Sequence, residues 1–135
     1  MIEEKKEILK ELLIDEGSIL KELVNKAKKI FKIDKKSGRT VLLIPTTRLS
    51  DRELIVLTLT GRYFASKLNF FDSDSMTIGD IAQELNMTKE SVSARTSELK
   101  RERLVETLTR GEYRISYTEI GRLLDELSEK VSGKK

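Results

Sequence analysis

The sequence contains no cysteine and no histidine, and this double absence excludes several kinds of site. Without cysteine there are no disulfides and no thiol nucleophiles, and without either residue a zinc finger cannot be assembled. The lack of histidine also removes the commonest general base. The 7 glycines are scattered and form neither of the phosphate-binding patterns GxGxxG and GxxxxGK[ST]. We therefore expect a protein that is not an enzyme, with no catalytic residues, no metal site and no cofactor.

Aromatic residues are scarce, at 5% of the 135 residues, which argues against a stacking platform for single-stranded nucleic acid. Long hydrophobic runs are also missing: the longest uncharged segments, 40–47 and 54–61, have 8 residues each. A transmembrane helix needs roughly 20, and the mixed charges of the N-terminus do not resemble a signal peptide. We expect a soluble, cytoplasmic and nucleoid-associated protein. The high lysine, glutamate and arginine content without cysteine also suits a thermophile.

The charge is small overall, +3, but it is unevenly distributed. Segments 1–49 and 86–117 are basic, segment 50–85 is acidic, and segment 118–135 is neutral. The densest basic stretch lies between residues 26 and 39, and such a stretch can bind nucleic acid or can simply be a solvated surface. Its candidate contact residues, which form a possible second basic patch, are Lys28, Lys29, Lys32, Lys35, Lys36 and Arg39.

The N-terminal segment 1–49 shows two helical patterns and one strand pattern. Apolar residues at helical spacing predict helices over 2–14 and 19–31, the second capped by Ser18. The turn signal Lys35–Gly38 lies between 31–34 and the β-branched run 39–44, which predicts a strand or a short hairpin. We expect this segment to pack on the rest of the chain.

A longer helix is expected over 50–68. The sequence Ser50-Asp51-Arg52-Glu53 has the S-x-x-E pattern of a capping box. The helix is apolar on more than one side, and a helix of that kind is buried. It either lies between the N-terminal segment and the C-terminal domain or packs against a second subunit.

The remaining chain repeats short helices and then turns to strand patterns. After a polar loop at 69–75, Thr77 and Asp80 predict a capped helix that ends at Asn86, and Thr88 caps a helix over 89–102. Strand-like runs at 104–109 and 112–117 follow across Arg110-Gly111, and a last helix over 118–131, capped by Thr118, precedes the frayed tail 132–135. Two helices separated by three or four residues form a helix-turn-helix unit, and the hairpin after it is the winged version.

Residues 77–106, TIGDIAQELNMTKESVSARTSELKRERLVE, resemble the core of prokaryotic winged helix-turn-helix transcription regulators, bacterial or archaeal, of the MarR/ArsR-like kind. Tyr113-Arg114-Ile115-Ser116 and Thr118-Glu119-Ile120-Gly121 resemble the wing exit and last helix of the same families. The fold class is thus mainly α with a small β-hairpin (α+β), a winged-helix domain at 50–131 with an N-terminal helical extension.

Three positions depart from the family pattern. Asn86 and Arg103 stand where glycine is frequent, so that Arg103 must accept a strained cap unless the helix ends differently. Thr96 replaces a large apolar residue, which makes that core contact thin or polar.

Segment 89–102 is the candidate recognition helix. Its small residues would let the backbone enter a major groove, and its basic residues can read guanine or neutralise phosphate. Glu90 and Glu98 on or near the same face would repel phosphate, and the alternative interpretation is a solvated helix face. The wing carries Arg110 at its tip, where it would contact the DNA backbone. The candidate DNA-binding residues are Thr88, Lys89, Ser91, Ser93, Ala94, Arg95, Ser97, Lys100, Arg101, Arg110 and Arg114.

Three functional hypotheses follow. The first is a transcription regulator that binds double-stranded DNA as a homodimer, with helices 2–14, 50–68 and 118–131 as the dimer surface. The second is a winged-helix protein-interaction module in a transcription, replication or repair assembly, which Glu90, Glu98 and Glu102 favour. The third, a regulator that responds to a small molecule, requires an apolar pocket between the helices.

Overall fold

The computed structural model describes residues 2–13, 16–109 and 111–131. The protein is mainly helical with two small antiparallel sheets, as expected for the α+β class. Residue Arg110 and the tail 132–135, both named in the sequence analysis, lie outside the described residues. The elements are α1 (Ile2–Leu9), η1 (Lys10–Leu12), α2 (Glu16–Ala27), β1 (Phe31–Ile33), β2 (Thr40–Leu42), η2 (Thr46–Arg48), α3 (Asp51–Lys67), β3 (Met76–Thr77), α4 (Ile78–Leu85), α5 (Lys89–Arg101), β4 (Val105–Thr107), β5 (Glu112–Ile115), η3 (Tyr117–Glu119) and α6 (Ile120–Val131).

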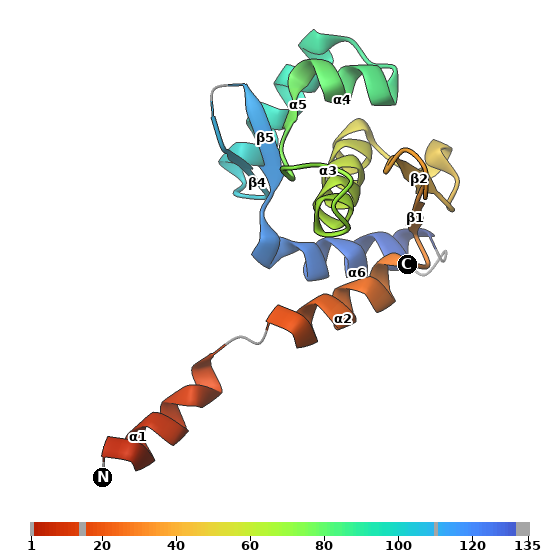
Figure 1. Cartoon of the computed structure of the whole chain (residues 1–135). Coiled ribbons are helices and arrows are strands. Elements are labelled where there is room, and N and C mark those ends of the chain that lie inside the picture. The colour runs from red at the N-terminus through yellow and green to blue at the C-terminus, as the bar shows by residue number, and fades with distance from the viewer. Residues whose placement is uncertain (1, 14–15, 110, 132–135) are drawn as a thin grey trace.

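Helix α3 runs through the middle of the molecule (Figure 1). Residues Ile55 to Gly61 are buried without interruption, and so are Tyr63, Phe64 and Ala65. Elements from both halves of the chain contact α3, namely β1 and β2 on one side and α4, α5 and β5 on others. This confirms that the helix expected over 50–68, which is apolar on more than one side, lies between the N-terminal segment and the C-terminal part of the same chain.

The C-terminal sheet has three strands in the order β3-β5-β4. The expected hairpin is formed by β4 and β5, with Val105 opposite Ile115 and Thr107 opposite Tyr113. Strand β3 was not expected from the sequence, because its two residues follow the polar loop and look like the start of a helix. Met76 pairs with Tyr113 in β5, so that this strand fixes the start of α4 against the hairpin.

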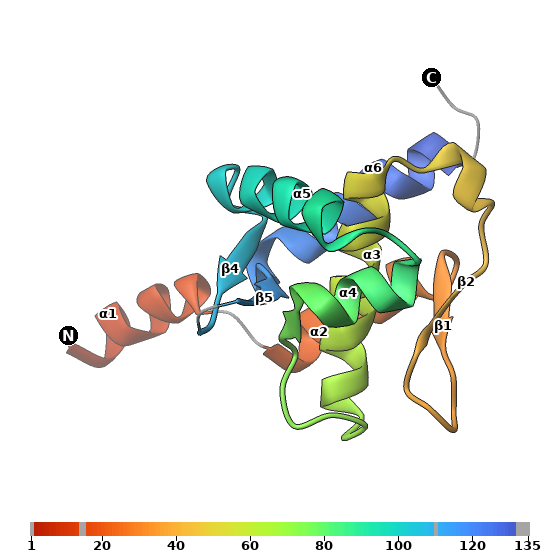
Figure 2. The ribbon, with the colours of Figure 1, turned by 90° about the horizontal axis from the view of Figure 1, so that it is seen from above.

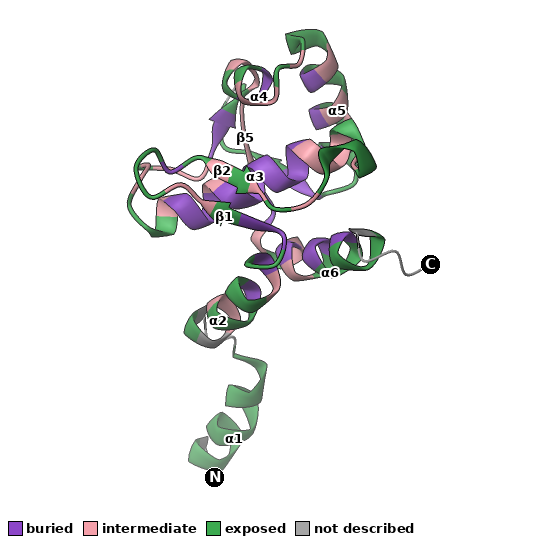
Figure 3. Ribbon diagram, turned by 90° about the vertical axis from the view of Figure 1, so that its right-hand side faces the viewer, coloured by how far each residue is buried: buried purple, intermediate pink, exposed green. Residues whose placement is uncertain are grey.

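The N-terminal segment divides into a part that packs on the body and a part that does not. The hairpin β1–β2 pairs Phe31 with Leu42 and contacts α3, and α2 lies beside α6. Helix α1 projects away from the body, and residues 3–13 are all exposed (Figures 1 and 3). The expectation that the whole of segment 1–49 packs on the rest is therefore wrong for α1.

Three other expected boundaries are also wrong. The second helix ends at Ala27 rather than at Phe31, because Ile30 and Phe31 enter the core from a turn and a strand. Ser18 lies inside α2, which begins at Glu16, and Thr118 lies inside η3, so neither stands at the N-cap position expected of it.

The local signals around α3, α4 and α5 are confirmed. Full capping boxes join Ser50 to Glu53 and Thr77 to Asp80, and the Thr88 hydroxyl accepts a hydrogen bond from the Ser91 N–H. Asn86 and Arg103 both adopt the left-handed conformation, with φ of 55° and 63°. A non-glycine residue is strained there, Asn least of all, so that Arg103 does accept the strained cap.

Thr96 is fully buried, as a polar replacement in the core. Its hydroxyl donates hydrogen bonds back to the carbonyls of Val92 and Ser93, at 2.9 and 3.1 Å. The buried polar group is thus satisfied within α5, and the contact stays polar as expected.

No helix within the described part of the chain combines the length and the apolar character needed to cross a bilayer.

The close approach of α3 to β2 gives a test of this packing. A Cβ added at Gly61 would lie 1.8 Å from Thr40 Oγ1, whereas a Cβ added at Gly79 would meet nothing nearer than 3.7 Å. We expect Gly61→Ala to lower the free energy of unfolding by about 1–3 kcal/mol through overpacking. Gly79→Ala, in α4, is the matched control and should be neutral or stabilising by up to about 1 kcal/mol. Urea denaturation measures both, and equal effects of the two changes would contradict the close packing of α3 on β2.

Candidate functional site

Helix α5 and the hairpin β4–β5 lie side by side on one flank of the molecule (Figure 2). Three side chains, Val92, Thr96 and Leu99, are buried beneath α5, which contacts α3 and α4. The connection from α4 to α5 spans only residues 86–88, so the angle between these helices is set by a left-handed Asn86 and the Thr88 cap. The outer side of α5 is left open to solvent.

This outer side carries most of the candidate DNA-binding residues. The exposed basic residues Lys89, Lys100 and Arg101 make no salt bridge with any described residue. They face solvent together with the carboxylate of Glu90, and Glu102, at the end of the helix, is exposed as well. The small residues of the set are exposed as well, except the half-buried Ser91; they are Thr88, Ser93, Ala94 and Ser97.

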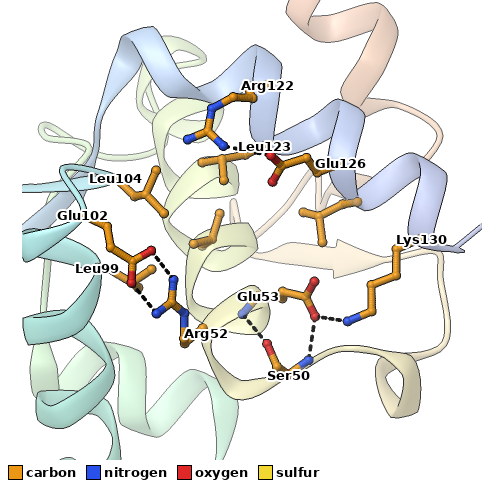
Figure 4. Close-up of a pocket in the computed structure, with 12 residues that line it drawn as sticks. Ser50, Arg52, Glu53, Leu99, Glu102, Leu104, Arg122, Leu123, Glu126 and Lys130 are labelled. Atoms are coloured by element: carbon orange, nitrogen blue, oxygen red, sulfur yellow. Dashed lines mark hydrogen bonds and ion pairs between the residues drawn. The ribbon is translucent and has the colours of Figure 1, made fainter. Parts of the chain in front are cut away.

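Two carboxylates of this region, Glu98 and Glu102, bind Arg52 of α3, and Figure 4 shows the pair with Glu102. The Arg52 guanidinium donates two hydrogen bonds of 2.5 Å to the Glu102 carboxylate, and one of 3.4 Å to Glu98. The hydrogen bonds from Arg52 lower the pKa of Glu102, and those to Glu102 raise the pKa of Arg52. A bidentate pair of this kind fixes orientation as well as charge. Arg52 therefore anchors the C-terminal turn of α5, and together with Arg95, which binds Glu98, it offsets the charges of these two carboxylates.

Two predicted contact residues are already engaged in ion pairs. Arg95 is half-buried and donates to Glu98 at 2.9 Å. Arg114 donates to Glu106, directly opposite it in the sheet, at 3.0 Å. Arg114 is thus half-buried in a cross-strand pair and does not lie on the freely solvated face that its alternation in the sequence indicated.

Hydrogen bonds to Glu112 fix the end of the β4–β5 hairpin that lies next to its turn. The Glu112 carboxylate accepts hydrogen bonds from the hydroxyls of Thr109 and Ser75, and these bonds lower the pKa of Glu112. The hairpin is therefore tied to the segment that leads into β3. Its exposed residues include Thr107, Leu108 and Thr109.

The second basic patch does not lie beside α5. The hairpin β1–β2 flanks α3 on the side opposite to β4–β5 (Figures 1 and 2). The six candidate residues are all exposed, but they extend from the turn before β1 to the turn before β2 rather than forming one cluster. The patch residues placed in this way are Lys28, Lys29, Lys32, Lys35, Lys36 and Arg39.

Next to that hairpin lies a hollow of about 580 Å³ whose lining includes Arg39, Arg62 and Glu84. The Arg62 guanidinium stacks on the Phe71 ring, 3.4 Å from its centre. Burial raises the pKa of Glu84, against the attraction of Arg39 and Arg62. The hollow therefore contains both signs of charge and favours neither an anion nor a cation.

A second hollow, of about 380 Å³, lies between α3, α5 and α6 (Figure 4). Its floor is apolar, but its rim cations are already paired: Arg52 with Glu102, Lys130 with Glu53 at 2.5 Å, and Arg122 with Glu119 and Glu126. The Arg52 and Lys130 bridges join α3 to the end of α5 and to α6, whereas the Arg122 bridges lie within η3 and α6. The arrangement is a charged seam between helices, which differs from the apolar pocket that a small-molecule regulator requires.

Sequence reasoning missed two residues of this region. Arg52 was recognised only as part of a capping box, because its partners Glu98 and Glu102 lie 46 and 50 residues further along the chain. Arg103 was considered only as a helix end, yet it is exposed beside Arg101. The basic side chain of Arg103, next to the candidate recognition helix, was the signal that could have added it to the candidate DNA-binding residues.

Comparisons with protein-family models, with curated proteins and with solved structures found no match to this chain.

The bridge from Arg52 predicts a pH-dependent stability. Arg52→Gln should lower the melting temperature at pH 7, because it leaves Glu102 without a cation and Glu98 with Arg95 alone. The pKa of Glu102 is lowered in the folded state, so this stabilisation is present above the ordinary carboxylate pKa and is lost as the pH falls through the lowered value. Thermal unfolding of wild type and variant should therefore differ at pH 7 and converge in acid. The matched control is Arg122→Gln. Arg122 binds Glu126 in its own helix and Glu119 directly before that helix, so its ion pairs do not join separate helices. An equal effect of the two substitutions on the melting temperature would contradict the anchoring role of Arg52.

For Glu84 we predict a substitution effect on the melting temperature that is opposite in sign to that of Arg52→Gln. The pKa of Glu84 is raised, mainly by burial, so its ionised form destabilises the folded state at neutral pH. We expect Glu84→Gln to raise the melting temperature at pH 7 and the gain to shrink as the pH falls, because the wild-type carboxyl then becomes protonated. The exposed Glu90→Gln is the control. A lower melting temperature for Glu84→Gln at pH 7 would show that the attraction of Arg39 and Arg62 outweighs the cost of burial.

Proposed function

We propose that this protein is a transcription regulator that binds double-stranded DNA through α5, with the hairpin β4–β5 along the DNA backbone. The observation that carries the proposal is the outer face of α5. There Lys89, Lys100 and Arg101 lie on one exposed surface with the small residues Ser93, Ala94 and Ser97. Small side chains allow a helix backbone to approach the floor of a groove about 12 Å wide, and the cations neutralise phosphates at its edges.

The resemblance to winged helix-turn-helix regulators supports the same proposal. Helices α4 and α5 are joined by residues 86–88, and the hairpin follows α5 directly. We propose that the fold is a winged helix in which α5 enters the major groove. The Arg52 bridges would hold α5 against α3 during that contact.

The alternative is a winged helix that binds a protein partner. The sequence feature that favours this protein-interaction hypothesis is the set of carboxylates Glu90, Glu98 and Glu102 on the candidate recognition helix. Glu98 and the exposed Glu102 bind Arg52, and Glu90 is the carboxylate of α5 that makes no salt bridge within the described chain. This distribution supports DNA over an interaction with a basic protein surface.

A double substitution tests the proposal. Lys100→Ala/Arg101→Ala should weaken binding to a fluorescently labelled duplex of mixed sequence by about tenfold for each side chain lost. It should also reduce the steepness with which affinity falls as salt is added, since fewer counterions are released. Fluorescence anisotropy at several salt concentrations measures both.

The matched control is Lys35→Ala/Lys36→Ala, which removes the same two charges from the turn between β1 and β2. It should leave the affinity almost unchanged. An equal loss from both double variants would show that binding follows net charge or the second basic patch. No binding by the wild type at low salt would favour the protein-interaction module.

We propose further that the protein acts as a homodimer, which would present two copies of α5 to two half-sites of an operator.

A further inference from the structure

Fewer helices offer an apolar face to a second subunit than the sequence indicated. The apolar residues of α3 are largely buried inside the chain, and so are Ile120, Leu123, Leu124 and Leu127 of α6. Two of the three helices expected to form a dimer surface therefore use their apolar faces within the chain. The third, α1, does not.

Helix α1 with η1 displays an apolar stripe that nothing in the described chain covers. Its side chains Ile8, Leu9, Leu12 and Leu13 are 67%, 57%, 78% and 73% exposed. An isolated helix shorter than roughly 12–15 residues is marginal in water, and its stability comes from packing an amphipathic face. Helix α1 has 8 residues, followed by a single 3-10 turn. Such a segment needs a partner surface to remain helical.

An apolar groove of about 420 Å³ lies on the body between α2, β1 and the end of α3. Two of its apolar side chains are well exposed, Val24 at 44% and Leu68 at 60%. Its apolar lining includes Leu20, Val24, Phe31, Ile33, Phe64 and Leu68.

The charges around the groove complement those of α1. The groove is lined by three lysines, Lys28, Lys32 and Lys67, and by no acidic residue. On α1, Lys5 lies within the apolar stripe and Lys6 and Lys10 lie toward one edge of it, whereas helical spacing places Glu4, Glu7 and Glu11 along the other edge, beside Ile8. Acidic side chains would thus meet basic ones as the apolar surfaces meet.

We propose that α1 of one copy of this chain occupies the groove of a second copy, and that the two copies exchange their α1 helices reciprocally. A second copy is the occupant because α1 projects away from its own groove (Figures 1 and 3). A two-fold exchange makes each contact twice, and the swapping of an identical element is a low-cost route to a dimer. The inference rests on the proposed homodimer but not on DNA binding, so that either can fail alone.

Cysteine cross-linking tests the exchange, since the chain has no cysteine of its own. Protein carrying only Leu12→Cys is mixed with protein carrying only Val24→Cys, and the mixture is treated with a short bismaleimide. The exchange predicts a covalent heterodimer on a denaturing gel. The matched control replaces Val24→Cys by Leu108→Cys, which is exposed to a similar extent, 45%, but lies in the turn between β4 and β5, on the other side of α3. A heterodimer in both mixtures, or in neither, overturns the proposal.

The double variant Leu12→Cys/Val24→Cys separates exchange from folding back. A cross-linked dimer supports exchange, whereas a cross-linked monomer of altered mobility shows that α1 occupies its own groove and overturns it. Light scattering on the wild type adds the mass, and a monomer of 15.5 kDa at micromolar concentration contradicts the proposal.

Charge reversal gives a second, independent readout. Lys28→Glu/Lys32→Glu should weaken dimerisation about fivefold or more, and Glu4→Lys/Glu11→Lys in the same chain should restore it. Lys35→Glu/Lys36→Glu, in the turn away from the groove, is the control and should leave the dimer unchanged. An equal effect of control and rim variants, or no restoration, contradicts the seating of α1 in this groove.

Discussion

The burial of α3 on all sides is the constraint on which the rest of the structure depends. A helix with an uninterrupted buried stretch from Ile55 to Gly61 must be covered on every face. The chain supplies that cover from both directions, with β1 and β2 from the N-terminal side and α4, α5 and β5 from the C-terminal side. The positions of these elements relative to one another are therefore set through α3, and so is the surface that α5 presents.

The same helix also sorts the charges of α5. Arg52 lies in the first turn of α3 and binds Glu98 and Glu102, which are four residues apart and so lie on one side of α5. Lys100 and Arg101 lie between them in sequence but on another side of the helix. A segment that is mixed in charge in the sequence thus becomes a helix in which Glu98 and Glu102 are bound by Arg52, while Lys89, Lys100 and Arg101 make no salt bridge among the described residues. This separation makes nucleic-acid contact the better supported of the two proposals.

Features that depend on neighbours in sequence were predictable, and features that depend on distant partners were not. The capping boxes at Ser50 and Thr77 and the left-handed Asn86 follow from local hydrogen bonding and backbone sterics. Strand β3 was missed because it exists only through pairing with β5, more than 30 residues later. Ile30 and Phe31 continue a helical stripe in the sequence but reach the core from a turn and a strand. For the site, the outward position of Arg101 followed from helical periodicity, whereas the pairing of Arg95 with Glu98 did not.

The central claim is that the outer face of α5 contacts duplex DNA, and the most direct measurement is a residue-by-residue map of that contact. Titration of ¹⁵N-labelled protein with a mixed-sequence duplex, followed by amide chemical shifts, gives such a map for a chain of 15.5 kDa. The account predicts the largest shifts at 88–101 and in the turn between β4 and β5, with small shifts in α2 and α6. Shifts confined to the β1–β2 hairpin, or no shifts at low salt, would contradict it.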